Sequence, residues 1–89
     1  GLMRQLAVDL APFGITCNTV SPGFILTERG RADWERRDEA QKEKEMQTIA
    51  VGRLGAPQEI ADVIAFVASE EAAYVVGQTI SVDGGHWMF

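Results

Sequence analysis

The side chains that most often perform acid–base or nucleophilic chemistry are scarce in this sequence. It contains one histidine, His86, one cysteine, Cys17, and one tyrosine, Tyr74. His86 has no second ligand at metal spacing, so we expect a surface or interface histidine rather than a metal ligand. Cys17 stands among apolar and hydroxyl residues, where a thiol is usually buried and inert. The sequence therefore predicts no metal site.

The backbone around Pro22 and Gly23 is a better candidate for ligand binding. Residues 15–21 (ITCNTVS) are rich in β-branched side chains and predict a strand, which Pro22 and Gly23 close. Ligands of open α/β sheets bind outside the carboxyl ends of the strands, which is where residues 22–27 lie. A glycine lets the backbone approach a flat ring, and main-chain amides can hold an uncharged amide group. On the Pro-Gly dipeptide alone, a plain strand-ending turn remains the alternative.

Two helices and a second strand are expected to position this bend. Apolar residues at helical spacing predict a helix from residue 2 to about residue 11, stopped by Gly14. No capping residue precedes this stripe, so we expect a helix that is cut open at its start. Pro57 opens a second helix with Glu59 in its first turn, and residues 78–82 (QTISV) alternate as a strand does. The expected buried stripe of the second helix comprises Ile60, Val63, Ile64, Val67 and Ala68.

Charged residues dominate the segment between the Pro-Gly bend and the second helix. Residues 28–47 (ERGRADWERRDEAQKEKEMQ) predict a solvated helix or a helix pair. Their apolar anchors are few, and we expect a mobile segment because few buried contacts mean low local stability. These anchors are Trp34, Ala40, Met46 and Ile49.

The overall composition bounds the function classes. Eighty-nine residues suffice for one domain, and a net charge of −5 argues against nucleic-acid binding and against an anionic membrane surface. No apolar run approaches the ~20 residues of a membrane span, no signal peptide is expected, and one cysteine favours a cytoplasmic setting. A strand, a helix and a strand in series usually form a parallel crossover, yet two strands alone leave both edges and one face open. We therefore expect further strands, from an upstream stretch or from another chain.

Four segments, in order, resemble the C-terminal half of the short-chain dehydrogenase/reductase family. They are residues 6–18 (LAVDLAPFGITCN), 21–27 (SPGFILT), 52–61 (GRLGAPQEIA) and 77–85 (GQTISVDGG). The resemblance implies an α/β fold, namely the C-terminal part of a single Rossmann-like domain with a doubly wound parallel sheet over residues 1–89. It also implies that residues 27–50 form the helical insertion that binds substrate.

The resemblance further implies a role for the bend and the insertion in an NAD- or NADP-dependent oxidoreductase. Pro22 and Gly23 would pass beside the nicotinamide ring, and Ile25 would offer backbone hydrogen bonds to the carboxamide. Thr27 would offer its hydroxyl to the carboxamide or to a phosphate of the cofactor. Trp34 and Met46 would belong to a lid over a small alcohol or carbonyl substrate; the alternative for Trp34 is to anchor a thin amphipathic helix. Asn18 is expected to satisfy backbone groups of a neighbouring strand rather than to act in catalysis.

The family's catalytic serine and Tyr-x-x-x-Lys pair are absent, since Gln78 stands four residues after Tyr74. No glycine-rich phosphate-binding turn occurs either, so we expect these residues alone to be inactive. The resemblance implies a homodimer or homotetramer, and the apolar residues Trp87, Met88 and Phe89 suggest subunit contact. The alternative is a truncated, non-enzymatic remnant that serves as an oligomerisation or binding module.

Overall fold

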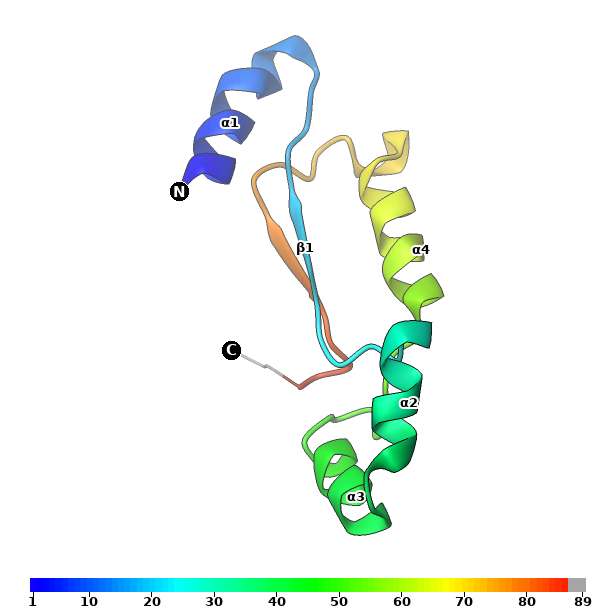
Figure 1. The fold of residues 1–89 in the computed structure, drawn as a ribbon. Helices are drawn as coiled ribbons and strands as arrows, with labels where there is room; N and C mark the ends of the chain where they lie inside the picture. The colour runs from blue at the N-terminus through cyan, green and yellow to red at the C-terminus, as the bar shows by residue number, and fades with distance from the viewer. Residues whose placement is uncertain (87–89) are drawn as a thin grey trace.

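The structure is a computed structural model, and it describes residues 1–86. The chain combines helices with a pair of strands, which confirms the predicted α/β class (Figure 1). Their order is α1 (Leu2–Leu10), η1 (Ala11–Phe13), β1 (Thr19–Pro22), α2 (Glu28–Arg36), α3 (Glu39–Gln47), α4 (Pro57–Val67), η2 (Glu70–Ala72) and β2 (Thr79–Val82). The apolar tail at residues 87–89, for which subunit contact is expected, lies outside the described residues.

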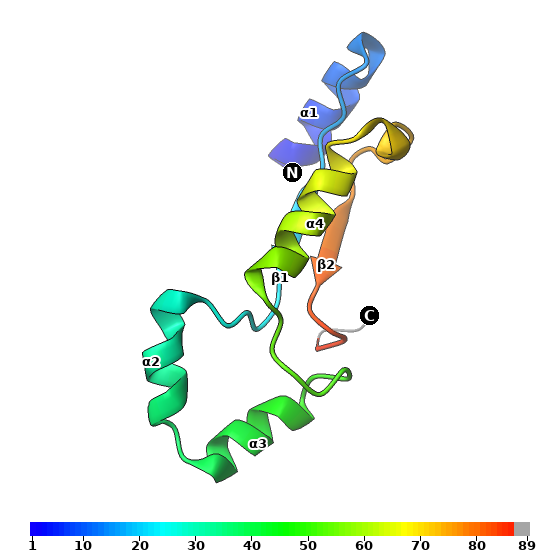
Figure 2. The ribbon, with the colours of Figure 1, turned by 90° about the vertical axis from the view of Figure 1, so that its right-hand side faces the viewer.

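Strands β1 and β2 pair in parallel, as the strand–helix–strand order predicts. Thr19 lies opposite Thr79, and Pro22 lies opposite Val82. Helix α4 covers one face of this pair, and α1 lies on the other side near the amino ends of the strands (Figures 1 and 2). The carboxyl ends of both strands thus meet at one edge, where the Pro22–Gly23 bend begins.

The first strand is shorter than its sequence predicts. It begins at Thr19, whereas residues 15–18 are not part of the ladder. Because β2 begins only at Thr79, the parallel register offers residues 15–18 no strand to pair with among residues 1–86. Instead, the Cys17 carbonyl accepts a hydrogen bond from the Gly77 amide at 2.8 Å. Cys17 is half-buried and outside the strand, so its prediction as a buried strand residue was wrong on both counts.

The described residues enclose very little core. The buried apolar side chains are those of Ala7, Ile49 and Ala72. The predicted buried stripe of α4 is not buried, and Ile64 is 50% exposed, because two strands are too narrow to cover a helix face. The radius of gyration is 16.2 Å, against about 12 Å for a compact domain of this length. These residues therefore need a further surface to pack against, as the sequence predicts.

The charged segment forms the helix pair α2 and α3, below the sheet in Figure 1. Each helix begins at a side-chain cap. Thr27 Oγ1 accepts a hydrogen bond from the Gly30 amide at 3.0 Å, and Asp38 Oδ1 accepts one from the Gln41 amide at 2.8 Å. Such caps satisfy backbone amides that the first helical turn leaves unpaired. No helix within residues 1–86 is long and apolar enough to cross a membrane.

Candidate cofactor and substrate site

The bend after β1 runs alongside the loop that precedes α4. The Gly23 amide donates to the Val82 carbonyl at 3.1 Å, which carries the ladder one residue past the strand. Ile25 then forms a parallel bridge with Gly55. In this bridge the Gly55 amide donates to the Phe24 carbonyl, and the Leu26 amide donates to the Gly55 carbonyl, both at 2.9 Å. Residues 23–26 are thereby fixed in an extended conformation.

The bridge leaves the backbone groups of Ile25 available. Backbone groups of successive residues in an extended segment are directed to opposite sides, so the Ile25 amide and carbonyl are directed away from Gly55. Within residues 1–86 neither group takes part in a backbone hydrogen bond. One donor and one acceptor thus stand side by side just beyond the carboxyl end of β1.

The structure accounts for Gly23 by the packing of the chain itself, whereas the sequence suggested the approach of a flat ring. A Cβ atom built on Gly23 would lie 2.5 Å from Asp83 Cβ and 2.7 Å from Asp83 Cα. The close approach of the turn after β2 therefore already excludes a side chain here. A flat ring is not required to explain the residue.

Thr27 caps α2 and retains the ability to donate. Its hydroxyl oxygen accepts from the Gly30 amide, and the hydroxyl hydrogen remains for another acceptor. A Cβ atom on Gly30 would come within 3.2 Å of this oxygen, so the absence of a side chain at Gly30 gives the cap room. The cap is a role that the resemblance did not indicate for Thr27.

Trp34 faces a hollow between α2 and the bend. The hollow has a volume of about 250 Å³, and its lining combines apolar and charged side chains. The lining comprises Phe24, Ile25, Leu26, Gly30, Asp33, Trp34, Arg37, Glu45 and Leu54. The guanidinium of Arg37 lies 5.6 Å from the centroid of the Trp34 ring, and the Lys42 ammonium lies 5.9 Å from it. Trp34 and Ile25 are therefore brought to one site.

Met46 lies elsewhere. It lines a separate hollow with Glu39, Lys42, Glu43, Gln47, Ile49 and Gly52. The two predicted lid residues thus do not share one cavity in the described structure. A nine-residue helix presents several faces, and no pattern in residues 39–47 indicated which face of α3 is directed toward the bend.

Comparison with known proteins decides the family. A family model described as enoyl-(acyl carrier protein) reductase matches residues 1–86. This chain belongs to the short-chain dehydrogenase/reductase family.

Several relatives of this family match nearly the whole chain. The 3-oxoacyl-[acyl-carrier-protein] reductase FabG of Escherichia coli is 44% identical over 88 residues, which are 99% of this chain and 34% of that protein. The FabG of Vibrio cholerae is 42% identical over 88 residues, which are also 99% of this chain and 34% of that protein. Dehydrogenase/reductase SDR family member 4 of Oryctolagus cuniculus is 42% identical over 85 residues, or 96% of this chain and 32% of that protein.

A solved structure agrees with this assignment. The NADPH-dependent reductase YwfH, described as involved in bacilysin biosynthesis, superposes with a TM-score of 0.86 at 37% identity. The match covers 99% of this chain and 36% of YwfH. The chain thus spans about a third of the length of these relatives, and its fold is that of a short-chain dehydrogenase/reductase segment.

Tyr74 is poorly placed for the family's chemistry. It is fully exposed and precedes β2, so it lies at the opposite end of the strands from the Pro22–Gly23 bend. Gln78, four residues later, uses its amide nitrogen to donate to the Val76 carbonyl at 3.1 Å. Within residues 1–86 no three His, Cys, Asp or Glu side chains gather to hold a metal ion.

Asn18 performs the structural task predicted for it. Its Nδ2 donates to the Val75 carbonyl at 2.9 Å, and its Oδ1 accepts from the Gln78 amide at 3.0 Å. Both partners belong to the segment that leads into β2. One amide side chain therefore joins the approaches to the two strands.

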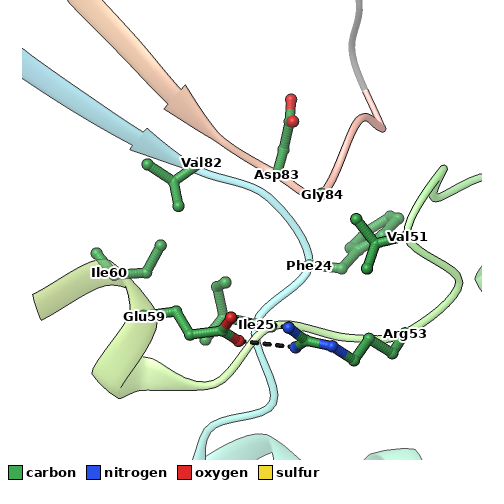
Figure 3. A pocket seen from close by; sticks show the side chains of 10 residues that line it. Phe24, Ile25, Val51, Arg53, Glu59, Ile60, Val82, Asp83 and Gly84 are labelled. Atoms are coloured by element: carbon green, nitrogen blue, oxygen red, sulfur yellow. Dashed lines mark hydrogen bonds and ion pairs between the residues drawn. The ribbon is translucent and has the colours of Figure 1, made fainter. Parts of the chain in front are cut away.

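The ion pair between Arg53 and Glu59 is a feature that sequence reasoning missed. Arg53 Nη1 and Nη2 lie 2.7 Å and 2.8 Å from the two Glu59 carboxylate oxygens, beside a cavity of about 110 Å³ (Figure 3). Glu59 Oε1 also accepts from the Ala56 amide at 2.9 Å, which caps the start of α4. The Arg53 and Ala56 hydrogen bonds lower the pKa of Glu59 to about 2. The glutamate in the first turn of α4 was a signal of such a cap, but nothing identified Arg53 as its partner.

Proposed function

We propose that this chain supplies the C-terminal part of an NAD- or NADP-dependent oxidoreductase that interconverts small alcohols and carbonyl compounds. In this proposal Pro22, Gly23, Ile25 and Thr27 form one wall of the nicotinamide site. Helices α2 and α3 form the lid over the substrate, and Trp34 faces the substrate cavity. Met46 would act in the same lid from its separate hollow.

The observation that carries the proposal is the available amide and carbonyl of Ile25. A nicotinamide carboxamide presents one carbonyl acceptor and one NH₂ donor, which an adjacent backbone donor and acceptor can satisfy together. Both groups stand at the carboxyl end of a parallel strand, where open α/β sheets bind their ligands. When bound, the nicotinamide supplies or accepts the hydride.

The relatives support a reductase but leave the cofactor and substrate open. FabG is named for a 3-oxoacyl carrier-protein substrate, and YwfH is described as NADPH-dependent. The apolar side chains that line part of the hollow beside Trp34, such as Phe24 and Leu54, suit an apolar part of a substrate. We further propose a homo-oligomer, because large apolar side chains such as Val8 and Phe66 remain exposed on α1 and α4. The proposed cytoplasmic setting is supported by the single cysteine.

The direct test uses the intact protein that carries this sequence. We expect it to bind NADH or NADPH and to oxidise the bound cofactor when a small carbonyl compound is added. The decrease in nicotinamide absorbance measures this reaction. Absence of both binding and oxidation with either cofactor would contradict the proposal and favour a non-enzymatic binding module.

Variants of Thr27 separate its two roles. Thr27→Ala removes both the cap and the hydroxyl donor, and it should weaken cofactor binding by ~0.5–1.5 kcal/mol if one hydrogen bond to the cofactor is lost. Thr27→Ser keeps both roles and should bind normally. Thr27→Asp keeps a good cap but has no side-chain donor, so it should bind the cofactor no better than Thr27→Ala. Cofactor titration by fluorescence distinguishes them, and an unchanged dissociation constant for Thr27→Ala would exclude the hydroxyl contact.

A further inference from the structure

The turn that follows β2 packs against the base of the lid. This base, residues 48–51, connects α3 to the loop before α4. The Val51 amide donates to the Gly84 carbonyl at 2.9 Å, and His86 Nδ1 lies 3.0 Å from the Thr48 carbonyl. A His86 tautomer protonated at Nδ1 donates this bond. These two bonds link the lid base to the turn, and the Ile49 carbonyl also accepts from the neighbouring Gly52 amide at 2.9 Å.

The packing between the turn and the lid base leaves no room for side chains. A Cβ atom on Gly85 would lie 2.6 Å from Ala50 Cβ, and one on Gly84 would lie 3.0 Å from Ile49 Cγ2. Ile49 is only 4% exposed, the most buried large side chain of the described residues. The lid base is thus held by close packing as well as by hydrogen bonds.

The same turn also touches the bend that bears Ile25. The His86 ring lies 4.6 Å from the Phe24 ring, centroid to centroid, and Asp83 closes against Gly23. The turn is itself fixed, because the Gly85 amide donates to Asp83 Oδ1 at 3.0 Å and the His86 amide donates to the Asp83 carbonyl at 3.1 Å. A single turn therefore contacts both the bend, including Phe24 in the lining of the hollow, and the base of the lid.

We infer that the turn Asp83–His86 anchors the lid base and thereby fixes the distance between the lid helices and the bend, so that Gly85 and His86 are positioning residues for the substrate. This inference rests on the proposed function, because only the proposed function assigns a substrate to the lid. Displacement of the turn would move the lid base while leaving the Ile25 backbone bridged to Gly55. Substrate binding should therefore suffer more than cofactor binding.

Gly85→Ala in the intact protein tests the anchor. The new methyl group must displace Ala50, and we expect KM for the carbonyl substrate to rise and kcat/KM to fall about ten- to hundredfold, as small misplacements do. The cofactor dissociation constant should stay unchanged. Hydrogen–deuterium exchange of residues 38–50 should become faster, because their anchor is loosened.

Gly14→Ala is the matched control. Gly14 has a φ of +76° and Gly85 one of +86°, so alanine strains both backbones, yet nothing lies within 4 Å of a Cβ on Gly14. This control should leave KM and lid exchange unchanged. Equal effects of the two variants on lid exchange would overturn the anchor.

A second substitution keeps the test decisive if Gly85→Ala alone folds poorly. Adding Ala50→Gly removes the clashing methyl group and should restore part of the lost kcat/KM and of the exchange protection. His86→Ala should also speed the hydrogen–deuterium exchange of residues 38–50, without a backbone clash. Exchange as slow as in the wild type in both this variant and Gly85→Ala would overturn the inference. Failure of the proposed function would appear instead as a wild-type protein that oxidises neither NADH nor NADPH, while the exchange measurements would still report on the anchor.

Discussion

The sheet layer and the lid are stabilised by different means. The sheet layer, α1, α4, β1 and β2, leaves large apolar side chains in solvent, with Leu2 78%, Val8 69% and Phe66 52% exposed. The lid, α2 and α3, is instead held by polar contacts such as the bond from Arg37 to Glu45 and by helix caps. The sheet layer therefore requires a further surface that buries its apolar side chains, whereas the polar side chains of the lid are compatible with contact to solvent.

This difference sets the scale of the energies in each region. Each Å² of apolar surface left in water forgoes about 25 cal/mol, so the open faces of α1 and α4 lose far more than any lid contact supplies. Exposed ion pairs contribute about 0–1 kcal/mol each. Burial of the apolar faces of the sheet layer should consequently decide whether these residues fold. The lid contacts only adjust the position of the lid.

The largest expected effect is seen when the 89-residue chain is studied alone. We expect no cooperative unfolding transition, because Ala7, Ile49 and Ala72 are too small a core to offset the conformational entropy lost. We also expect no enhancement of NADH fluorescence, because the chain has no glycine-rich phosphate-binding turn. Circular dichroism on heating and NADH titration measure the two outcomes. Micromolar NADH affinity would show instead that these residues form a self-sufficient site.

The elements that the sequence predicted well are those with local signals. Pro57 at the start of α4 and the alternation of residues 78–82 lie within the elements they define, and both elements were placed to within a residue or two. The start of β1 was missed because the length of a strand depends on its partner's register. That register is set some 60 residues away, at Thr79.

The site was predictable only in part for the same reason. The resemblance indicated the bend, and the bridge of Ile25 with Gly55 is compatible with that expectation. Contacts between distant segments had no sequence signal, and the approach of His86 to Thr48 spans 38 residues. Mobility of the lid stays a prediction.

The next largest effect should follow the loss of the Asn18 amide in the sheet layer. Asn18→Ala leaves the Val75 carbonyl and the Gln78 amide without this partner, and we expect the intact protein to lose ~1–3 kcal/mol of stability to unfolding. Asn18→Asp retains an acceptor for Gln78 and should differ from alanine. Urea denaturation measures both variants. A stability loss below the error of the method would mean that solvent replaces these bonds.

A smaller effect concerns the ion pair that starts α4. Hydrogen bonds from Arg53 and from the Ala56 amide hold the pKa of Glu59 at about 2, below its usual 4.5. Because the folded pKa is depressed, the stabilisation is fully present above pH 4.5 and is lost as pH falls toward 2. Glu59→Gln should flatten the decrease of Tm with pH over this window, and Arg53→Gln should flatten it also. Parallel Tm curves for wild type and both variants would contradict the assignment.

The smallest effect is expected within the lid, between Arg37 and Glu45. Arg37, the residue after α2, lies over the Trp34 ring and pairs with the Glu45 carboxylate of α3, so it joins the two helices together with Lys42, which also lies near Trp34. A double-mutant cycle with Arg37→Gln and Glu45→Gln should give a coupling of ~0.2–1 kcal/mol, because both groups remain partly in solvent. The quantity to measure is the opening free energy of α3 amides by hydrogen exchange in the intact protein.

The pair of Arg36 with Asp33 provides the internal standard for that cycle. These side chains lie 3.4 Å apart within α2 and are 76% and 77% exposed, so their coupling should be near zero. Raising the salt concentration to about 1 M should remove most of the Arg37–Glu45 coupling, because screening then acts over about 3 Å. A coupling that survives such salt would mean that a hydrogen bond shielded from solvent, rather than a screened ion pair, joins Arg37 to Glu45.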